Sequence, residues 1–171
     1  MTTQQTSPTM VVKLRKPAFP TKSKRHLLYY DNPSINPGAS GAAATHVFSC
    51  NGLYDPNITG TGHQPLGFDQ LTPLYDKYTV IGAKITITFA NTDSTYAQFG
   101  GVFITRNSAT EIDLTNIIEN GKGKYVRLGP AGLDSSQATI TMTCPVAKFL
   151  GISKILSEDD CSGTDSANPA A

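Results

Sequence analysis

The sequence predicts an all-β fold, an antiparallel β-sandwich of the jelly-roll type with short helices in its connections. Six segments have the character of strands, and the helical patterns are short and fall between them. Strands do not alternate with long helices, as they would in a parallel sheet. The connections fit Greek-key wiring, of which the jelly roll is a common version. With 171 residues and no internal repeat, the chain is expected to form one domain with its own core.

The N-terminal part supplies the first two expected strands. Residues 1–9 are polar and without periodicity, and Met10–Leu14 adds at most a short edge strand before two prolines. Arg25–Tyr30 is predicted to be the first core strand. A segment rich in turn-forming residues separates it from the second, Thr45–Cys50.

A long loop and a short helix follow. The loop at 51–64 contains several glycines and a proline, and ordered loops of this length are often functional or interfacial. Between Phe68 and Tyr78 apolar residues recur at spacings of three and four, which predicts a short helix. Pro73 limits this helix to about two turns or breaks it in two.

The clearest strand lies between Ala83 and Ala90. Apolar and polar residues alternate strictly there, with Ile85, Ile87 and Phe89 on one face. A period of two is typical of a strand with one buried side. Upstream of Gly82 the apolar residues have even numbers instead of odd ones. This change of parity at a glycine predicts a β-bulge.

The rest of the chain continues with strands and short helices. Tyr96–Arg106 is an expected strand, and its Gly100–Gly101 pair indicates a second bulge or a close backbone approach. Thr110 is the candidate N-cap of a helix that Asn120–Gly121 ends. Three elements complete the prediction: the strands Lys124–Leu128 and Ala138–Cys144, the latter with its even-numbered residues facing inward, and a helical turn at Val146–Leu150.

Charge divides the chain into two parts, a basic arm at 1–25 and a body at 26–171. The arm contains six bases and no acid, whereas the body carries a net charge of −5. A proline-stiffened basic segment can bind the phosphates of a nucleic acid without reading its bases. The bases of the arm fall in two clusters, KLRK and KSKR, which would also suit recognition by the host nuclear import machinery. A tail that only makes the protein more soluble is the simpler alternative. The six bases are Lys13, Arg15, Lys16, Lys22, Lys24 and Arg25.

Nothing in the sequence predicts an enzyme, a cofactor or a resident metal. Three cysteines without CxxC spacing argue against a zinc site or a disulfide framework, and the three histidines are scattered. GTGHQPLG lacks the Lys-Ser/Thr of a P-loop. A calcium site built from Asp55 and the acids near the C-terminus is one alternative, although a solvated acidic loop is favoured. Those acids are Glu158, Asp159, Asp160 and Asp165.

Several ordered motifs resemble the capsid proteins of circular, Rep-encoding single-stranded DNA viruses. They are NGLYDP, GHQP, GFDQ and YTVIGAKI, followed by TMTCPVAKFLGISKI, an acidic segment and ANP, over roughly residues 45–169. The resemblance implies a single jelly-roll subunit that assembles with itself into a small icosahedral shell around circular single-stranded DNA. The expected locations are the virion and, during assembly, the host nucleus.

The chain differs from the family that it resembles in two respects. Family members usually continue past the NP dipeptide into two more strands, one for each sheet, so we expect this chain to lack its last two strands. Their arms are usually richer in arginine than this one. Jelly-roll subunits associate through loops at the ends of their sheets, and the candidate apolar contacts between subunits are Tyr54, Leu66 and Phe68.

Two other classes of function compete with the capsid interpretation. A non-viral β-sandwich that binds a carbohydrate or a protein is one, but the chain has no tryptophan and no aromatic ladder. A cupin-like enzyme would need clustered histidines on its strands. Membrane insertion is not expected, because no apolar run approaches the roughly 18 residues that span a bilayer.

Overall fold

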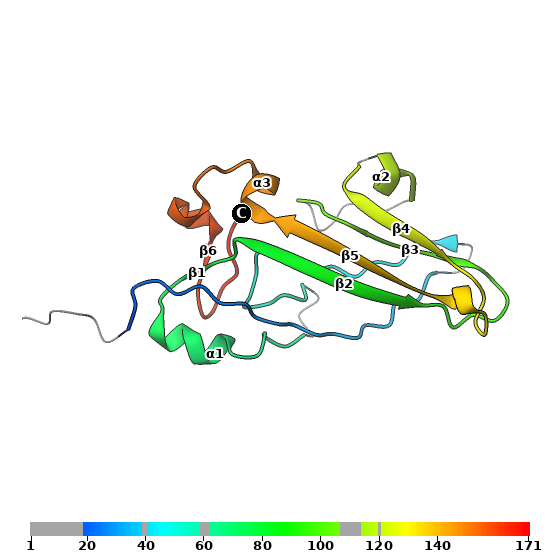
Figure 1. The fold of residues 1–171 in the computed structure, drawn as a ribbon, viewed down its shortest axis with the longest axis horizontal. Coiled ribbons are helices and arrows are strands. Elements are labelled where there is room, and N and C mark those ends of the chain that lie inside the picture. The colour runs from blue at the N-terminus through cyan, green and yellow to red at the C-terminus, as the bar shows by residue number, and fades with distance from the viewer. Residues whose placement is uncertain (1–18, 39–40, 59–61, 107–113, 120) are drawn as a thin grey trace, which may run out of the picture.

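The computed structural model describes residues 19–38, 41–58, 62–106, 114–119 and 121–171 (Figure 1). Strands dominate over a few short helices, which confirms the prediction of an all-β antiparallel architecture. The strands are β1 (Tyr78–Thr79), β2 (Gly82–Ala90), β3 (Gln98–Phe103), β4 (Gly123–Leu128), β5 (Gln137–Pro145) and β6 (Ser162–Gly163). The α-helices are α1 (Phe68–Leu71), α2 (Leu114–Glu119) and α3 (Val146–Leu150). Short 3-10 turns are η2 (Thr72–Leu74), η3 (Asp134–Ser136), η4 (Ile155–Ser157) and η5 (Asp159–Cys161).

β2 and β5 form the longest sheet, an antiparallel pair that runs from Gly82 opposite Pro145 to Ala90 opposite Gln137. The predicted alternation is confirmed on both strands. On the inner face the half-buried Ile85 and Ile87 lie opposite the buried side chains of β5. On the outer face threonines pair across the strands, and the hydroxyls of Thr88 and Thr139 are 2.9 Å apart. Such cross-strand pairs contribute a few tenths of a kcal/mol to about 1 kcal/mol each.

The change of parity at Gly82 marks a change of partner strand, and the predicted bulge is wrong. β1 pairs with β6, whereas β2 pairs with β5 through nine consecutive residues with no insertion. In the link between β1 and β2, the carbonyl of Ile81 accepts a hydrogen bond from the amide of Val146 at 3.2 Å. The parity of the apolar residues therefore changes because the chain passes from one two-stranded sheet to another.

β3 and β4 form a second antiparallel pair, which packs face to face on the first. Gly100 is buried in β3, and a Cβ atom at this position would lie 2.8 Å from the ring of Phe89 in β2. Real Cβ atoms do not approach so closely, so the contact requires glycine. The six pairs of β3 and β4 are continuous. The close backbone approach predicted for the Gly100–Gly101 pair is thus confirmed, and the alternative of a bulge is wrong.

Two predicted strands do not form ladders. Arg25–Tyr30 alternates in exposure from Leu27 onward, with Leu28 and Tyr30 exposed, but it pairs with no strand among the residues that the structure describes. Thr45–Cys50 contributes only an isolated bridge between Phe48 and Asn57. Alternation predicts which side chains share a face, but it does not supply a neighbour with free backbone groups at strand spacing. Both strand predictions are therefore wrong.

The predicted helices are confirmed where the structure describes them. Pro73 divides the first into α1 and η2. α2 ends at Glu119, and Gly121 shortly after it has a φ of 63°, the conformation of a glycine that closes a helix. Thr110, like Met10–Leu14, lies outside the described residues. The main core cluster joins the end of β5 to the C-terminal turns, and its buried members are Cys144, Val146, Ile155 and Cys161.

Candidate functional surfaces

The described part of the basic arm is fully accessible. Lys22, Lys24 and Arg25 are exposed, and Arg25 donates a hydrogen bond only to the neighbouring carbonyl of Lys24, at 3.2 Å. Among the described residues the single ion pair is between Lys77 and Asp159, so none of these three bases is neutralised by a described carboxylate. They are available to an external anion. The other three predicted contacts, Lys13, Arg15 and Lys16, lie outside the described residues.

The three predicted apolar contacts between subunits differ in exposure. Leu66 is 88% exposed and Tyr54 is 40% exposed, so both present apolar surface to solvent. Phe68 is only 2% exposed, and its ring packs edge-on against Tyr78 with centroids 5.5 Å apart. Within one chain Phe68 thus fixes α1 against the body, whereas Leu66, just before α1, has little to pack on.

The NGLYDP loop is held by one amide side chain from the C-terminal ANP motif. Asn168 Oδ1 accepts hydrogen bonds from the backbone amides of Tyr54 at 3.1 Å and Asp55 at 3.2 Å. Its Nδ2 donates to the carbonyl of Asp55 at 3.0 Å. A Cβ on Gly52 would lie 2.6 Å from this amide group, so glycine permits the close approach. Two motifs separated by more than 100 residues thus form one structural unit.

Tyr78 completes this unit from β1. Its hydroxyl accepts from the amide of Leu53 at 2.9 Å and donates to Asn168 Oδ1 at 3.2 Å. Burial raises the pKa of Tyr78, although the hydrogen bonds from Leu53 and Tyr54 oppose the shift. The ring lies over Gly163 of β6, where a Cβ would be 2.3 Å away. We call Asn168 and Tyr78 with the loop they hold, residues 51–57, the loop clamp.

A second polar cluster joins the extended N-terminal segment to the loop before α1. The two ring nitrogens of His63 lie 2.8 Å from the carbonyl of Gln64 and 2.9 Å from that of Tyr30. These two acceptors, with the nearby Asp31 carboxylate, raise the pKa of His63 above its ordinary value of 6.5. Asp31 itself accepts hydrogen bonds from Tyr29 at 3.1 Å and from Asn57 at 2.8 Å. The imidazole thus bridges two segments, and its doubly protonated form donates to both carbonyls.

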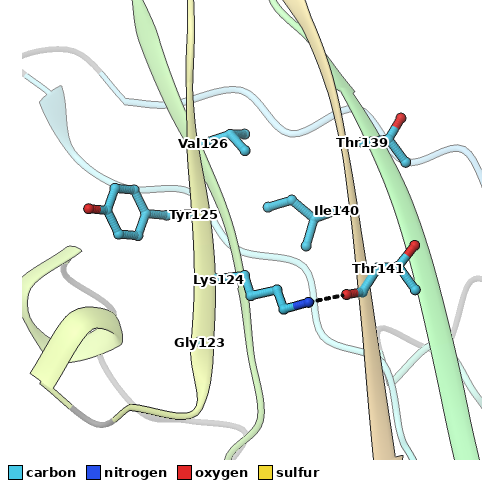
Figure 2. A pocket seen from close by; sticks show the side chains of 7 residues that line it. All are labelled: Gly123, Lys124, Tyr125, Val126, Thr139, Ile140 and Thr141. Carbon is cyan, nitrogen blue, oxygen red and sulfur yellow. Dashed lines mark hydrogen bonds between the residues drawn. The ribbon is translucent and has the colours of Figure 1, made fainter.

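An open cavity of about 440 Å³ lies between β4 and β5 (Figure 2). Lys124 crosses it, and its ammonium group donates to the carbonyl of Thr141 at 2.8 Å. Tyr125 points away from β5 in the same view. Since the only cation in the lining is engaged with the backbone, the cavity offers little for a charged ligand. Its lining is Gly123, Lys124, Tyr125, Val126, Thr139, Ile140 and Thr141.

The cysteine, histidine and acidic side chains were the remaining candidates for metal binding or reactivity. In the part of the chain that the structure describes, no group of three or more histidine, cysteine or acidic side chains is arranged to hold a metal ion. Cys50, Cys144 and Cys161 are free thiols in or against the core cluster. Burial, with the neighbouring Cys144, raises the pKa of Cys50 to about 11, so its thiol is unreactive near neutral pH. No described helix is both long and apolar enough to span a bilayer.

Comparison of the chain with protein-family models, with curated proteins and with solved structures finds no match. Evidence about function therefore comes from the residues and their geometry alone.

The sequence indicated some of these surfaces and missed others. The length of the loop at 51–64 predicts a functional or interfacial role, and the structure adds the side chains that hold it, Tyr78 and Asn168. Their role could not be read from sequence, since hydrogen bonds over such separations follow no local pattern. The exposed side chains of Phe99 and Tyr125 were also missed. For Tyr125 the alternation was a usable signal, because Val126 and Leu128 set the apolar parity of its strand, whereas Phe99 shares its parity with the apolar Phe103.

Proposed function

We propose that this chain is a viral coat subunit with a single jelly-roll fold, which assembles with itself into a small icosahedral shell. The shell packages circular single-stranded DNA, and the N-terminal arm contacts the phosphates. No catalytic step is part of this function.

The observation that carries the proposal is the set of capsid-like motifs and their meeting in one unit. NGLYDP, the Tyr78 that begins YTVIGAKI and the ANP near the C-terminus join in the loop clamp. Motifs that depend on each other for their conformation support a resemblance better than motifs scattered over the surface. The face-to-face packing of the β2–β5 and β3–β4 pairs is compatible with a jelly roll.

Two surfaces support the assembly and packaging parts of the proposal. The unpaired bases Lys22, Lys24 and Arg25 form a polycation next to an acidic body, which suits a polyanion that is held by an extension. Leu66 and Tyr54 expose apolar surface at a clamped loop and a short helix. Rigid apolar groups of this kind serve as anchors between protein subunits.

Electron microscopy of the expressed full chain tests the proposal. We expect closed shells of uniform diameter that contain nucleic acid. Leu66→Asp should prevent closure, because it puts a charge into a desolvated contact, whereas Leu133→Asp, at another exposed leucine, should leave shells intact. A monodisperse monomer at high protein concentration would sink the proposal.

A further inference from the structure

The outer face of the β3–β4 sheet carries two aromatic rings and a guanidinium group that have no partners in the described chain. Phe99 is 58% exposed and Tyr125 is 49% exposed, and Arg127 is exposed as well. None of the three side chains makes a hydrogen bond, ion pair or ring contact with another described residue. Exposed apolar groups that gather in one patch, unlike scattered single ones, mark a site of interaction.

The register of the sheet places these groups next to each other. Phe99 lies directly opposite Arg127, and Gly101 lies directly opposite Tyr125. The two rings are therefore diagonal neighbours on one face, a relation that puts residues about 7–8 Å apart. Because Gly101 has no side chain, nothing from β3 covers the ring of Tyr125. The result is a surface with two exposed aromatic side chains and one exposed cation.

The charges of the two strands favour an anionic partner. β3 and β4 contain no acidic residue, and their two bases are Arg127 and Lys124. Lys124 is used on the other face, where it holds Thr141, so Arg127 is the cation of the outer face. A protein partner with an apolar patch would use the rings but leave this guanidinium buried without a counter-charge. A polyanion with planar groups satisfies both features.

We propose that Phe99, Tyr125 and Arg127 form a stacking platform for single-stranded nucleic acid. Each ring stacks on one base, and the guanidinium binds a phosphate between them. Stacking on side chains needs unpaired bases whose faces are free, so a duplex is a poor ligand. The platform is separate from the basic arm, and it relies on the proposed coat function only for the source of the strand, a packaged genome.

The test measures binding of the full chain to two labelled probes of about ten nucleotides, oligo-dT and a chain of the same length without bases. We expect Phe99→Ala and Tyr125→Ala each to weaken binding of oligo-dT by between about 5-fold and 150-fold. Binding of the abasic chain should change less than about twofold, since it has nothing to stack. Tyr125→Phe should retain the affinity of the original chain for oligo-dT.

Tyr30→Ala is the matched control, because Tyr30 is an exposed aromatic residue outside the platform. It should leave both affinities unchanged, and circular dichroism should confirm that all variants fold. Unchanged binding of oligo-dT by both platform variants would overturn the platform. So would an equal loss on both probes, or a defect in self-association without one in binding, which would make this face a contact between copies.

The two proposals can fail separately. Closed shells from the platform variants, with oligo-dT affinity equal to that of the original chain, would leave the coat function standing and remove the platform. If the protein never forms shells, but Tyr125→Ala removes the part of binding that depends on bases, the coat function would fall and the platform would stand.

Discussion

Asn168 holds the loop at 51–57 through a single amide group, so its contribution to stability can be isolated. Asn168→Ala removes the hydrogen bonds to Tyr54 and Asp55. The backbone groups of Asp55 lose this partner, whereas the amide of Tyr54 keeps the Tyr78 hydroxyl at 3.3 Å. We expect the free energy of unfolding to fall by roughly 2–3 kcal/mol, at about 1 kcal/mol per net hydrogen bond. Urea denaturation measures this loss.

Asn32→Ala is the control, because Asn32 is an exposed asparagine outside the loop clamp. Asn168→Asp should lie between the two variants, since it keeps the acceptor for Tyr54 and Asp55 but loses the donor to the Asp55 carbonyl. Equal stability of the alanine variants at 168 and 32 would show that the loop is held by other contacts.

His63 makes a second prediction at the same scale, this time with pH. Only the imidazolium donates from both ring nitrogens, so the bridge between Tyr30 and Gln64 belongs to the charged form. Since the folded pKa lies above 6.5, the stabilisation is fully present below pH 6.5 and is lost as pH rises through the folded pKa. Asp31 titrates well below this window, because hydrogen bonds from Asn32 and Asn57 outweigh desolvation and lower its pKa.

The difference in melting temperature between the original chain and His63→Gln should therefore be largest at acidic pH and shrink above pH 6.5. Thermal melts between about pH 5 and pH 8.5 measure it. His26→Gln, at an exposed histidine, supplies the control series. A difference that stays constant with pH would mean that the neutral ring makes the same contacts.

At the scale of the elements, the contact of Gly100 with Phe89 sets the spacing between the two main sheets. Gly100→Ala puts a methyl group 2.8 Å from the Phe89 ring, and overpacking of this kind costs about 1–3 kcal/mol. Phe89→Leu gives the added methyl group more room. We expect Gly100→Ala to cost less in that background, so the double-mutant cycle should give a stabilising coupling energy. Additive losses would contradict a direct contact.

The elements also explain how far the sequence could lead. In β2 and β5 alternation and burial coincide, so their faces were predicted residue by residue. In Arg25–Tyr30 the same alternation occurs without a strand partner in the described part of the chain, because pairing depends on what lies beside a segment. Gly82 shows the same limit, since a change of partner and a bulge give the same parity signal. The sequence pattern of one strand thus predicts which of its side chains are buried, but it does not predict which strand pairs with it.

At the scale of the whole molecule, a candidate surface could be predicted from the sequence only where it depends on amino-acid composition. The arm follows from counting charges, whereas the platform of Phe99, Tyr125 and Arg127 depends on the register of β3 with β4. The arm is expected to supply the part of nucleic-acid binding that depends on salt, and the platform the part that depends on bases. The two contributions can be separated, because counterion release scales with the number of phosphates neutralised.

Replacing all six arm bases with glutamine should therefore flatten the dependence of log affinity on log salt for oligo-dT. Each contact to a single strand contributes about 0.7 to the slope, so the full set should reduce it by about 4 and either half by about 2. The halves are residues 13–16 and 22–25. The control replaces three exposed bases of the body, Lys84, Lys148 and Lys154. If this control flattens the slope as much as half of the arm does, binding is spread over the surface. In that case the arm has no special role, because its advantage lies in presenting unpaired charges away from the acids of the body.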